Sequence, residues 1–278
     1  MTTTAIVTDS NAQLPVELAE RLIVDVVDIP IVVDGVSHPE RSLDVDEFYA
    51  RLAAGAEVTT SQPSPGDFVA AYERAAAAGA EAIVSIHVGA ALSGTVNSAR
   101  LAAEMVDVPV TIVDSGQTSF SIGLCVTAAV AAREAGATPP EIAEAASAAS
   151  TRLGNVFVVS GLVLADGGGR LDVHGADAVA AEDVPVVALR GTDLEVVASV
   201  ADLEGAVEAM LETIAGEPGP LRVGVGVGDR AVMEIHDLMV GPLRDMAHVD
   251  EVVSYRCGPS VGAFSGPGVA GAAWLRLD

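Results

Sequence analysis

The stretch that decides the fold is Ala5-Ile6-Val7-Thr8-Asp9-Ser10, a mainly apolar run that ends in Asp-Ser. The same pattern returns at Val110-Thr111-Ile112-Val113-Asp114-Ser115. Both runs have the length and the β-branched residues of a buried strand. A helical segment follows each run, at residues 15–22 and at residues 121–135. Strands that alternate with helices pair in parallel, so the pattern predicts an α/β fold with a parallel sheet.

The segments between these two runs continue the alternation. A further apolar strand is predicted at residues 81–86. Other helices begin at patterns that combine an N-cap hydroxyl with glycine, proline or a following acid, at Ser64-Pro65-Gly66-Asp67, Ser93-Gly94-Thr95 and Thr138-Pro139-Pro140-Glu141. The last of these helices ends near Arg152. We therefore predict that residues 1–152 form an N-terminal α/β domain.

The order of elements changes after residue 152. Several apolar strand patterns follow one another, at residues 155–160, 184–189, 194–200, 222–228, 249–255 and 269–277. One helix is predicted to begin at Asp202, and a second is predicted to cover residues 230–240. Adjacent strands without a crossover helix favour an antiparallel or mixed sheet. Residues 153–278 are therefore predicted to form a second α/β domain.

The composition is acidic and aliphatic. The chain of 278 residues has 39 acidic and 14 basic side chains, which gives a net charge of -25. Such a charge repels phosphate backbones and anionic lipid surfaces, so general binding to nucleic acid or to a membrane surface is not expected. Hydrophobic residues make up 50% of the chain and aromatic residues 3%. Small and branched aliphatic side chains suit the core of an α/β sheet protein.

Other classes of protein are also not expected. The longest uncharged run near the C-terminus, residues 257–275, contains prolines and repeated glycines and lacks the pattern of a membrane span. Residues 1–5 lack the basic and apolar regions of a signal peptide, which predicts a cytoplasmic protein. Cys125 and Cys257 fit neither a disulfide framework nor a zinc pattern and are predicted to lie in the core. The histidines show no metal-ligand spacing, so neither a metal nor another cofactor is expected.

Segments rich in hydroxyls mark the candidate ligand site. Ligands of an open parallel sheet bind beyond the carboxyl ends of the strands. Such segments stand at or near strand ends and helix starts, at Asp9-Ser10, Thr59-Thr60-Ser61, Ser93-Gly94-Thr95 and Asp114-Ser115. Each can also serve only as a turn or an N-cap. Ser93-Gly94-Thr95 is the strongest candidate, because hydroxyls beside a glycine at a helix N-terminus favour an anion.

Three further features leave alternatives open. Gly224-Val225-Gly226-Val227-Gly228 has some likeness to a dinucleotide-binding loop, but the alternating valines favour a close-packed strand. Gly167-Gly168-Gly169-Arg170 either directs donors and a guanidinium to an acidic group or forms an exposed loop. His87 is near a strand end, where it either acts as a general base for Ser93 or Ser10 or is a polar loop residue.

Six segments, in order along almost the whole chain, resemble the DegV family: Ile6-Val7-Thr8-Asp9-Ser10, Thr60-Ser61-Gln62-Pro63-Ser64-Pro65, Leu92-Ser93-Gly94-Thr95 with Ser98-Ala99, Val113-Asp114-Ser115, Gly168-Gly169-Arg170 and Gly266-Pro267-Gly268. The second and third segments are the most specific. The resemblance implies a two-domain α/β protein that binds a long-chain fatty acid, such as palmitate, in a tunnel between the domains. It also implies a role in fatty-acid carriage or lipid metabolism, with the carboxylate held by Thr60 and Ser93.

Further ligand-site residues are expected in the same segments, namely Asp9, Ser10, Ser61, Gly94, Thr95, Ser115 and Arg170. Some members of the family present the bound acyl carboxylate to a fatty-acid kinase, so the resemblance implies such a kinase as a partner. The chain departs from the family at Phe264-Ser265, where members commonly carry a histidine, and in the short acidic stretch from Leu171 to Asp183. A headgroup role for histidine and a preferred acyl length are therefore not carried over.

Two other functions stay open. One is a serine hydrolase or acyltransferase that uses Ser93 or Ser10 with His87 as the base. The other is a phosphate or nucleotide binder built on Ser93-Gly94-Thr95. A lipid-binding protein without catalytic activity is the leading hypothesis, because the hydroxyl motifs are paired, no nucleophile elbow of the Gly-x-Ser-x-Gly kind is expected, and the histidines form no evident catalytic set.

Overall fold

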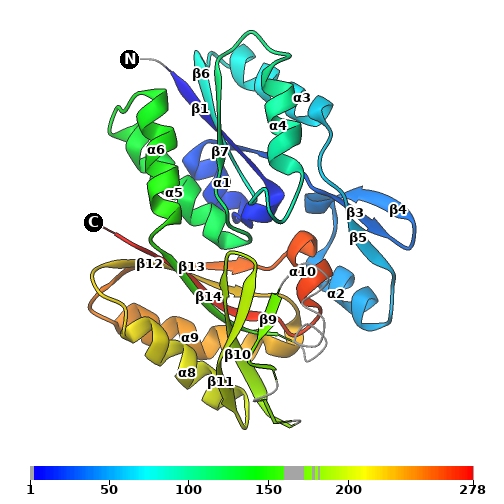
Figure 1. Ribbon diagram of the computed structural model, residues 1–278, viewed down its shortest axis with the longest axis vertical. Coiled ribbons are helices and arrows are strands. Elements are labelled where there is room, and N and C mark those ends of the chain that lie inside the picture. Colours follow the sequence, from blue (N-terminus) through cyan, green and yellow to red (C-terminus); the bar gives the residue numbers. More distant parts are fainter. Residues whose placement is uncertain (1–2, 160–171, 177–178, 181, 278) are drawn as a thin grey trace. The chain divides into compact units, whose positions relative to one another are not determined.

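The computed structural model describes residues 3–159, 172–176, 179–180 and 182–277 (Figure 1). The chain divides into two compact units. The first unit contains Met1–Ser42 and Thr59–Arg152, and the second contains Leu43–Val58 and Leu153–Asp278. Arg170 and the three glycines before it lie outside the described residues, so the two interpretations of that segment are not tested.

The first unit is built on a parallel four-stranded sheet in the order β2-β1-β6-β7. Its strands are β1 (Thr4–Asp9), β2 (Val24–Val27), β6 (Ala82–His87) and β7 (Val110–Asp114). The two apolar runs that end in Asp-Ser are β1 and β7, and the prediction of a parallel sheet is confirmed. β1 and β6 are the central strands, and every residue of β6 is buried.

Helices cover both faces of this sheet, with α3 and α4 on one side and α5 and α6 on the other (Figure 1). The helices of this unit are α1 (Val16–Leu22), α3 (Pro65–Ala77), α4 (Thr95–Ala103), α5 (Phe120–Glu134) and α6 (Pro139–Ser150). α3 and α6 begin at the predicted capping boxes, where Ser64 and Thr138 are the N-caps. Phe68 and Tyr72 of α3 pack with Val7 of β1 in a fully buried cluster.

A small three-stranded sheet, in the order β4-β3-β5, has no counterpart in the sequence prediction. Its strands are β3 (Pro30–Val33), β4 (Val36–Pro39) and β5 (Val58–Thr60), and the short 3-10 helices η1 (Ser10–Ala12) and η2 (Glu40–Ser42) follow β1 and β4. β3 and β4 form a hairpin whose turn residues, Asp34 and Gly35, have φ angles of 50° and 80°. Asp-Gly is a preferred pair for such a turn, because both residues must adopt positive φ.

The second unit has a mixed seven-stranded sheet in the order β13-β12-β14-β8-β10-β11-β9. Its strands are β8 (Leu153–Val158), β9 (Asp172–His174), β10 (Val184–Arg190), β11 (Asp193–Val200), β12 (Leu221–Val227), β13 (Val249–Arg256) and β14 (Ala270–Arg276). Its helical segments include α8 (Leu203–Ala215), η5 (Arg230–Val232), α9 (Met233–Asp245) and α10 (Pro259–Ser265). The predicted mixed sheet is confirmed. Gly226 lies inside β12, where a Cβ would come within 2.2 Å of the Tyr255 ring, so the glycine repeat forms a close-packed strand.

α2 (Val45–Ala53) belongs to the second unit although it comes early in the chain. Tyr49 is 1% exposed and donates its hydroxyl to Cys257 O at 2.9 Å. The Tyr49 ring fills the space beside Gly228 and Gly262, where a Cβ would lie 2.7 Å and 2.6 Å from Tyr49 atoms. The predicted N-terminal domain of residues 1–152 therefore includes a segment, residues 43–58, that packs in the second unit.

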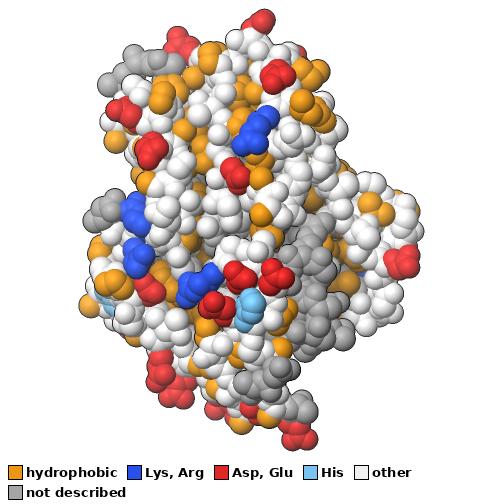
Figure 2. Space-filling view, viewed as in Figure 1, with side chains coloured by type: hydrophobic (Ala, Val, Ile, Leu, Met, Phe, Trp, Pro, Cys, Tyr) orange, Lys and Arg blue, Asp and Glu red, His pale blue; other side chains and the backbone are white. Residues whose placement is uncertain are grey.

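The two cysteines and the surface agree with the composition. Cys125 and Cys257 are both buried free thiols, as predicted, and burial raises the pKa of each to about 12. Figure 2 shows acidic side chains at many places on one face, in keeping with the net charge of -25. Within the described part of the chain, no helix combines the length and the apolar character needed to cross a membrane.

Candidate functional site

The site begins where the direction of the chain connections reverses in the first unit. From β1 the chain continues to β2 on one side, and β6 and then β7 follow on the other side. The carboxyl ends of β1 and β6 therefore meet at a topological switch point, which is where ligands of open α/β sheets bind. The loops that follow these two strands carry Asp9-Ser10 and residues 88–94. Asp9-Ser10 and the loop that leads to Ser93 therefore lie at the carboxyl edge of this sheet, whereas Thr60 ends β5 of the small sheet.

The loop after β6 is held at several points before it reaches Ser93. Successive backbone N–H groups donate to fixed acceptors: Val88 N to Asp9 Oδ2 at 3.0 Å, Gly89 N to Gln117 O at 2.8 Å and Ala90 N to Asp114 Oδ1 at 3.1 Å. The Ser93 N–H then donates to Gly89 O at 3.1 Å. Successive backbone groups that are paired in this way leave a loop little freedom. The position of the Ser93 hydroxyl is therefore set by the loop.

Ser93 is half-buried at the beginning of α4. Its Oγ lies 2.9 Å from Thr95 Oγ1 and accepts a hydrogen bond from Thr95 N at 3.3 Å. Gly94 is the N-cap residue and has no side chain to satisfy the first N–H groups of the helix. Thr95 is 0% exposed, so Ser93 is the hydroxyl of this motif that a ligand can reach.

The Thr60-Ser61-Gln62-Pro63-Ser64 segment forms a second fixed loop. Thr60 ends β5, and the Ser61 N–H donates to Pro30 O at 3.0 Å. Pro63 is buried, and Ser64 caps α3 through a capping box with Asp67. The backbone is thus anchored on both sides, while the side chains of Thr60, Ser61 and Gln62 remain available to a ligand. Among the described residues, neither the Thr60 hydroxyl nor the Gln62 amide has a hydrogen-bond partner.

The Gln62 side chain joins the two loops. It lies so close to Gly94 that a Cβ at residue 94 would be 1.8 Å from Gln62 Oε1. Only glycine fits at residue 94 while Gln62 keeps this position. The structure thus brings the Thr-Ser-Gln-Pro-Ser and Leu-Ser-Gly-Thr motifs together within one unit. The sequence prediction did not assign a role to Gln62, because an exposed glutamine between turn residues carries no periodic signal.

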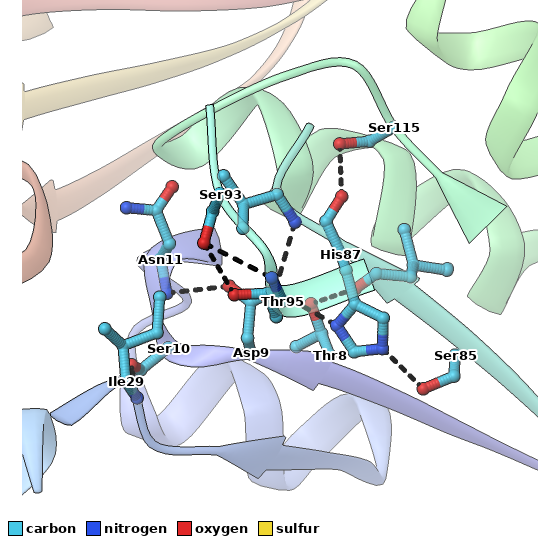
Figure 3. A network of polar contacts seen from close by, with 12 residues as sticks. Thr8, Asp9, Ser10, Asn11, Ile29, Ser85, His87, Ser93, Thr95 and Ser115 are labelled. Carbon is cyan, nitrogen blue, oxygen red and sulfur yellow. Dashed lines mark hydrogen bonds and ion pairs between the residues drawn. The ribbon is translucent and has the colours of Figure 1, made fainter. Parts of the chain in front are cut away.

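Asp9 and His87 form the buried centre of the site (Figure 3). His87 Nδ1 is 3.0 Å from Asp9 Oδ2, and Asp9 Oδ1 accepts a hydrogen bond from Asn11 N at 3.1 Å. The other ring nitrogen, Nε2, is 2.7 Å from Ser85 Oγ. Both nitrogens of the 0%-exposed His87 ring are therefore occupied inside the protein. The structure does not bring His87 to the hydroxyl of Ser93 or of Ser10, which the hydrolase hypothesis requires.

Ser85, His87 and Asp9 have the contacts of a catalytic triad but not its access. Ser85 is 0% exposed, and its Oγ is 2.9 Å from the hydroxyl of Tyr72. Burial raises the pKa of Tyr72 to about 12, so this phenol stays protonated and can donate to Ser85. A nucleophile must reach its substrate, and this serine faces other side chains. The chain of hydrogen bonds links α3, β6 and β1 and stabilises the strand ends.

Ser10 and Ser115 are both buried and use their hydroxyls within the protein. Ser10 Oγ donates to the buried Glu40 carboxylate and accepts from Ile29 N at 2.9 Å. Ser115 Oγ donates to His87 O at 2.6 Å. These contacts fasten η1 and the end of β7 to neighbouring strands, so direct contact of the two serines with a ligand stays a prediction.

One catalytic motif was missed in the sequence. Gly258-Pro259-Ser260-Val261-Gly262 has the Gly-x-Ser-x-Gly spacing of a nucleophile elbow, in which a strained turn exposes the serine. Ser260 instead lies in the first turn of α10, is 4% exposed and does not have positive φ. The motif therefore does not form an elbow. In the described ranges, no group of three or more His, Cys, Asp or Glu side chains is arranged to hold a metal ion.

Comparison with known proteins identifies the family. The model of the DegV family, a family of uncharacterised proteins, matches residues 3–277. The chain belongs to the DegV family. A DegV domain-containing protein of Streptomyces coelicolor is 33% identical over 277 residues, which cover 96% of each chain. A DegV domain-containing protein of Staphylococcus aureus is 30% identical over 280 residues and is covered completely.

Solved structures of other DegV proteins share the fold. A DegV family protein from Thermus thermophilus, described as binding fatty acid, is 28% identical, with a TM-score of 0.86 and coverage of 99% of this chain and 100% of that one. A DegV lipid-binding protein from Thermotoga maritima is 26% identical, also with a TM-score of 0.86, and the match covers 100% of this chain and 99% of that one. The two-domain α/β architecture predicted for this DegV chain is therefore confirmed.

Proposed function

We propose that this DegV protein binds a long-chain fatty acid and holds its carboxylate with the hydroxyls of Thr60 and Ser93. The observation that carries the proposal is the contact of Gln62 with Gly94, which brings together the two loops that bear these hydroxyls. The DegV proteins from Thermus thermophilus and Thermotoga maritima, described as binding fatty acid or lipid, support the ligand class.

The chemistry of the two loops suits a carboxylate. A carboxylate that leaves water needs hydrogen-bond donors, and hydroxyls beside a helix N-terminus supply them without a buried lysine. Burial of an acyl chain supplies most of the binding energy. At about 0.8 kcal/mol per CH2, roughly fourteen methylenes contribute on the order of 10 kcal/mol before the costs of association. The net charge of -25 opposes an anion at long range, so affinity depends on local donors and on burial.

The proposed role is carriage rather than catalysis. Both ring nitrogens of His87 have partners inside the protein, so His87 is not available as a base for Ser93. Palmitate is the proposed ligand, and a fatty-acid kinase that phosphorylates the presented carboxylate is the proposed partner. A cytoplasmic location belongs to the same proposal, because the proposed kinase would need the ATP of that compartment.

Mass spectrometry and direct binding test the proposal. Protein purified from cells and denatured should release a fatty acid of about C14 to C18, and protein stripped of lipid should bind palmitate. The double variant Thr60→Ala with Ser93→Ala should bind palmitate more than about tenfold more weakly and keep its fold. Thr59→Ala is the matched control, because successive strand residues point to opposite faces and Thr59 is exposed.

Two results would overturn the proposal. Protein that is empty on purification and also fails to take up palmitate would exclude the ligand class. Unchanged palmitate affinity in the double variant would show that other residues hold the carboxylate.

A further inference from the structure

We propose that Gln62 is a specificity-determining residue of the headgroup site and that its amide NH2 donates to the fatty-acid carboxylate beside Thr60 and Ser93. The inference rests on the proposed function and extends it to the chemistry of the headgroup. It accounts for a side chain that lies between the two hydroxyl loops and has no hydrogen-bond partner among the residues described.

The geometry separates the two ends of the Gln62 amide. Measured from the place where a Cβ of residue 94 would stand, the amide oxygen is at 1.8 Å, Cδ at 2.7 Å and the amide nitrogen at 3.3 Å. The oxygen is therefore the end of the amide nearer to that position, and the nitrogen is the more distant end. Gln62 is exposed. Its amide can therefore offer the NH2 group as a donor to a ligand beside the two loops.

The backbone is held in place on both sides of Gln62. Ser61 N donates to Pro30 O at 3.0 Å on one side, and Pro63 is buried on the other. Pro63 also restricts the backbone of Gln62 to extended conformations. A side chain that starts from a fixed backbone loses less conformational entropy when it binds a ligand. The amide of Gln62 is therefore positioned to donate a hydrogen bond to a carboxylate bound at the beginning of α4.

An amide at this position discriminates among headgroups by charge and by hydrogen-bonding capacity. A primary amide donates two hydrogens and carries no charge, so it binds a carboxylate more strongly than it binds an ester. A glutamate at the same position would accept only and would repel the carboxylate. Gln62 thus favours the free acid over its esters without adding a cation to an acidic protein.

The experiment compares palmitate with methyl palmitate, which has the same acyl chain but no ionised headgroup. Stripped protein, Gln62→Met and Gln62→Glu are titrated with both ligands by calorimetry or by displacement of a fluorescent fatty acid. Gln62→Met keeps the length of the side chain and removes the donors. We expect palmitate affinity to fall about threefold to tenfold in Gln62→Met and by more than about tenfold in Gln62→Glu. Affinity for methyl palmitate should stay within about twofold of the unsubstituted protein in both.

Gly94→Ala provides an independent test of the same contact. The added Cβ would collide with the Gln62 amide, so Gln62 must swing away. Palmitate affinity should then fall as in Gln62→Met, and the double variant Gly94→Ala with Gln62→Met should bind no more weakly than either single variant. Full additivity would contradict the inference, because it would mean that the two substitutions act through separate contacts.

The outcomes separate this inference from the proposed function. If the unsubstituted protein binds palmitate and Thr60→Ala with Ser93→Ala weakens it, but both Gln62 variants bind as the unsubstituted protein does, only the role of Gln62 is refuted. If both Gln62 variants weaken palmitate and methyl palmitate equally, Gln62 acts on the acyl chain or the fold and the headgroup role is also refuted. If neither the unsubstituted protein nor any of the variants binds palmitate, the proposed function itself fails.

Discussion

Replacing Asp9 with asparagine should destabilise the first unit, and the structure gives the reason and the size. Asp9 is fully buried at the end of β1 and accepts hydrogen bonds on both carboxylate oxygens. Oδ2 accepts from His87 Nδ1 and from Val88 N, both at 3.0 Å, and Oδ1 accepts from Asn11 N at 3.1 Å. An asparagine has one oxygen, so at least one of these donors must face an amide NH2 group.

The cost follows from the better of the two amide orientations. If the amide oxygen takes the place of Oδ2, it keeps the two donors there and leaves Asn11 N facing a donor. Losing one hydrogen bond to a buried charged group costs about 1.5–3 kcal/mol. At roughly 2–4 °C per kcal/mol for a unit of this size, the midpoint of thermal unfolding should fall by about 3–12 °C.

Asp114→Asn is the matched control, because Asp114 stands at the same place in the repeated pattern. Asp114 is exposed and accepts from Ala90 N and Gly116 N through one oxygen, Oδ1. An amide oxygen can accept both, so this variant should cost less than about 0.5 kcal/mol. Far-UV circular dichroism follows both units, whereas the fluorescence of Trp274, the single tryptophan, follows the second unit.

The expected result is a lower unfolding transition in circular dichroism for Asp9→Asn and an unchanged one for Asp114→Asn. Two transitions must be fitted separately, since a protein of two units need not unfold in one step. Equal transitions for the two variants would refute the reasoning, because burial and the number of accepting oxygens would then not set the cost.

Three further predictions concern the second unit and the thiols. Tyr49→Phe leaves the buried carbonyl of Cys257 without its donor and should lower the free energy of unfolding of this unit by about 1–2 kcal/mol. The tryptophan fluorescence should then change at a lower denaturant concentration than in the unsubstituted protein. An unchanged midpoint would show that water replaces the hydroxyl. The hydrogen bond from Arg256 holds the pKa of Asp46 below its ordinary value, so the pair stabilises the folded state above the unfolded pKa and loses this contribution as pH falls through the folded pKa. The stability difference between the unsubstituted protein and Asp46→Asn should therefore be present at neutral pH and vanish in acid, and a difference that persists at pH 2 would contradict it. Because burial raises the pKa of Cys125 and of Cys257 to about 12, both thiols should react with Ellman's reagent only after unfolding, and rapid reaction of the native protein would contradict their burial.

The parallel sheet of the first unit could be predicted because the signals for its strands and helices lie within short stretches of the sequence. Each strand of this sheet except β2 is a short apolar run that stops at polar residues. Helices α3 and α6 each begin at a capping box of their own. The segment 43–58 could not be assigned in the same way. α2 joins the second unit because Tyr49 fits beside Gly228 and Gly262, about two hundred residues away in sequence. No periodicity within residues 43–58 contains that information.

The candidate site shows the same division between local and distant causes. Parallel pairing alone predicts that Asp9, His87 and Asp114 lie at one edge of the sheet, and they do. The partner of His87 depends instead on which way its side chain points. Ser85 and His87 are two residues apart on one strand and therefore share a face, which gives the histidine a serine partner different from Ser93 or Ser10. The alternation along β6 was thus the available signal against a catalytic histidine.

The two Asp-Ser endings show most directly how strand order sets the environment of a side chain. In sequence they are equivalent, yet Asp9 is 0% exposed and pairs with His87, whereas Asp114 is exposed and binds backbone N–H groups. The difference comes from the strand order, because β1 lies between β2 and β6 while β7 is an edge strand. A carboxylate at the end of a central strand is surrounded by neighbouring strand ends, and one at the edge keeps a side open to water. The same dipeptide therefore carries a buried, paired carboxylate in one place and an exposed carboxylate that binds loop N–H groups in the other. The order of strands in the sheet accounts for the difference.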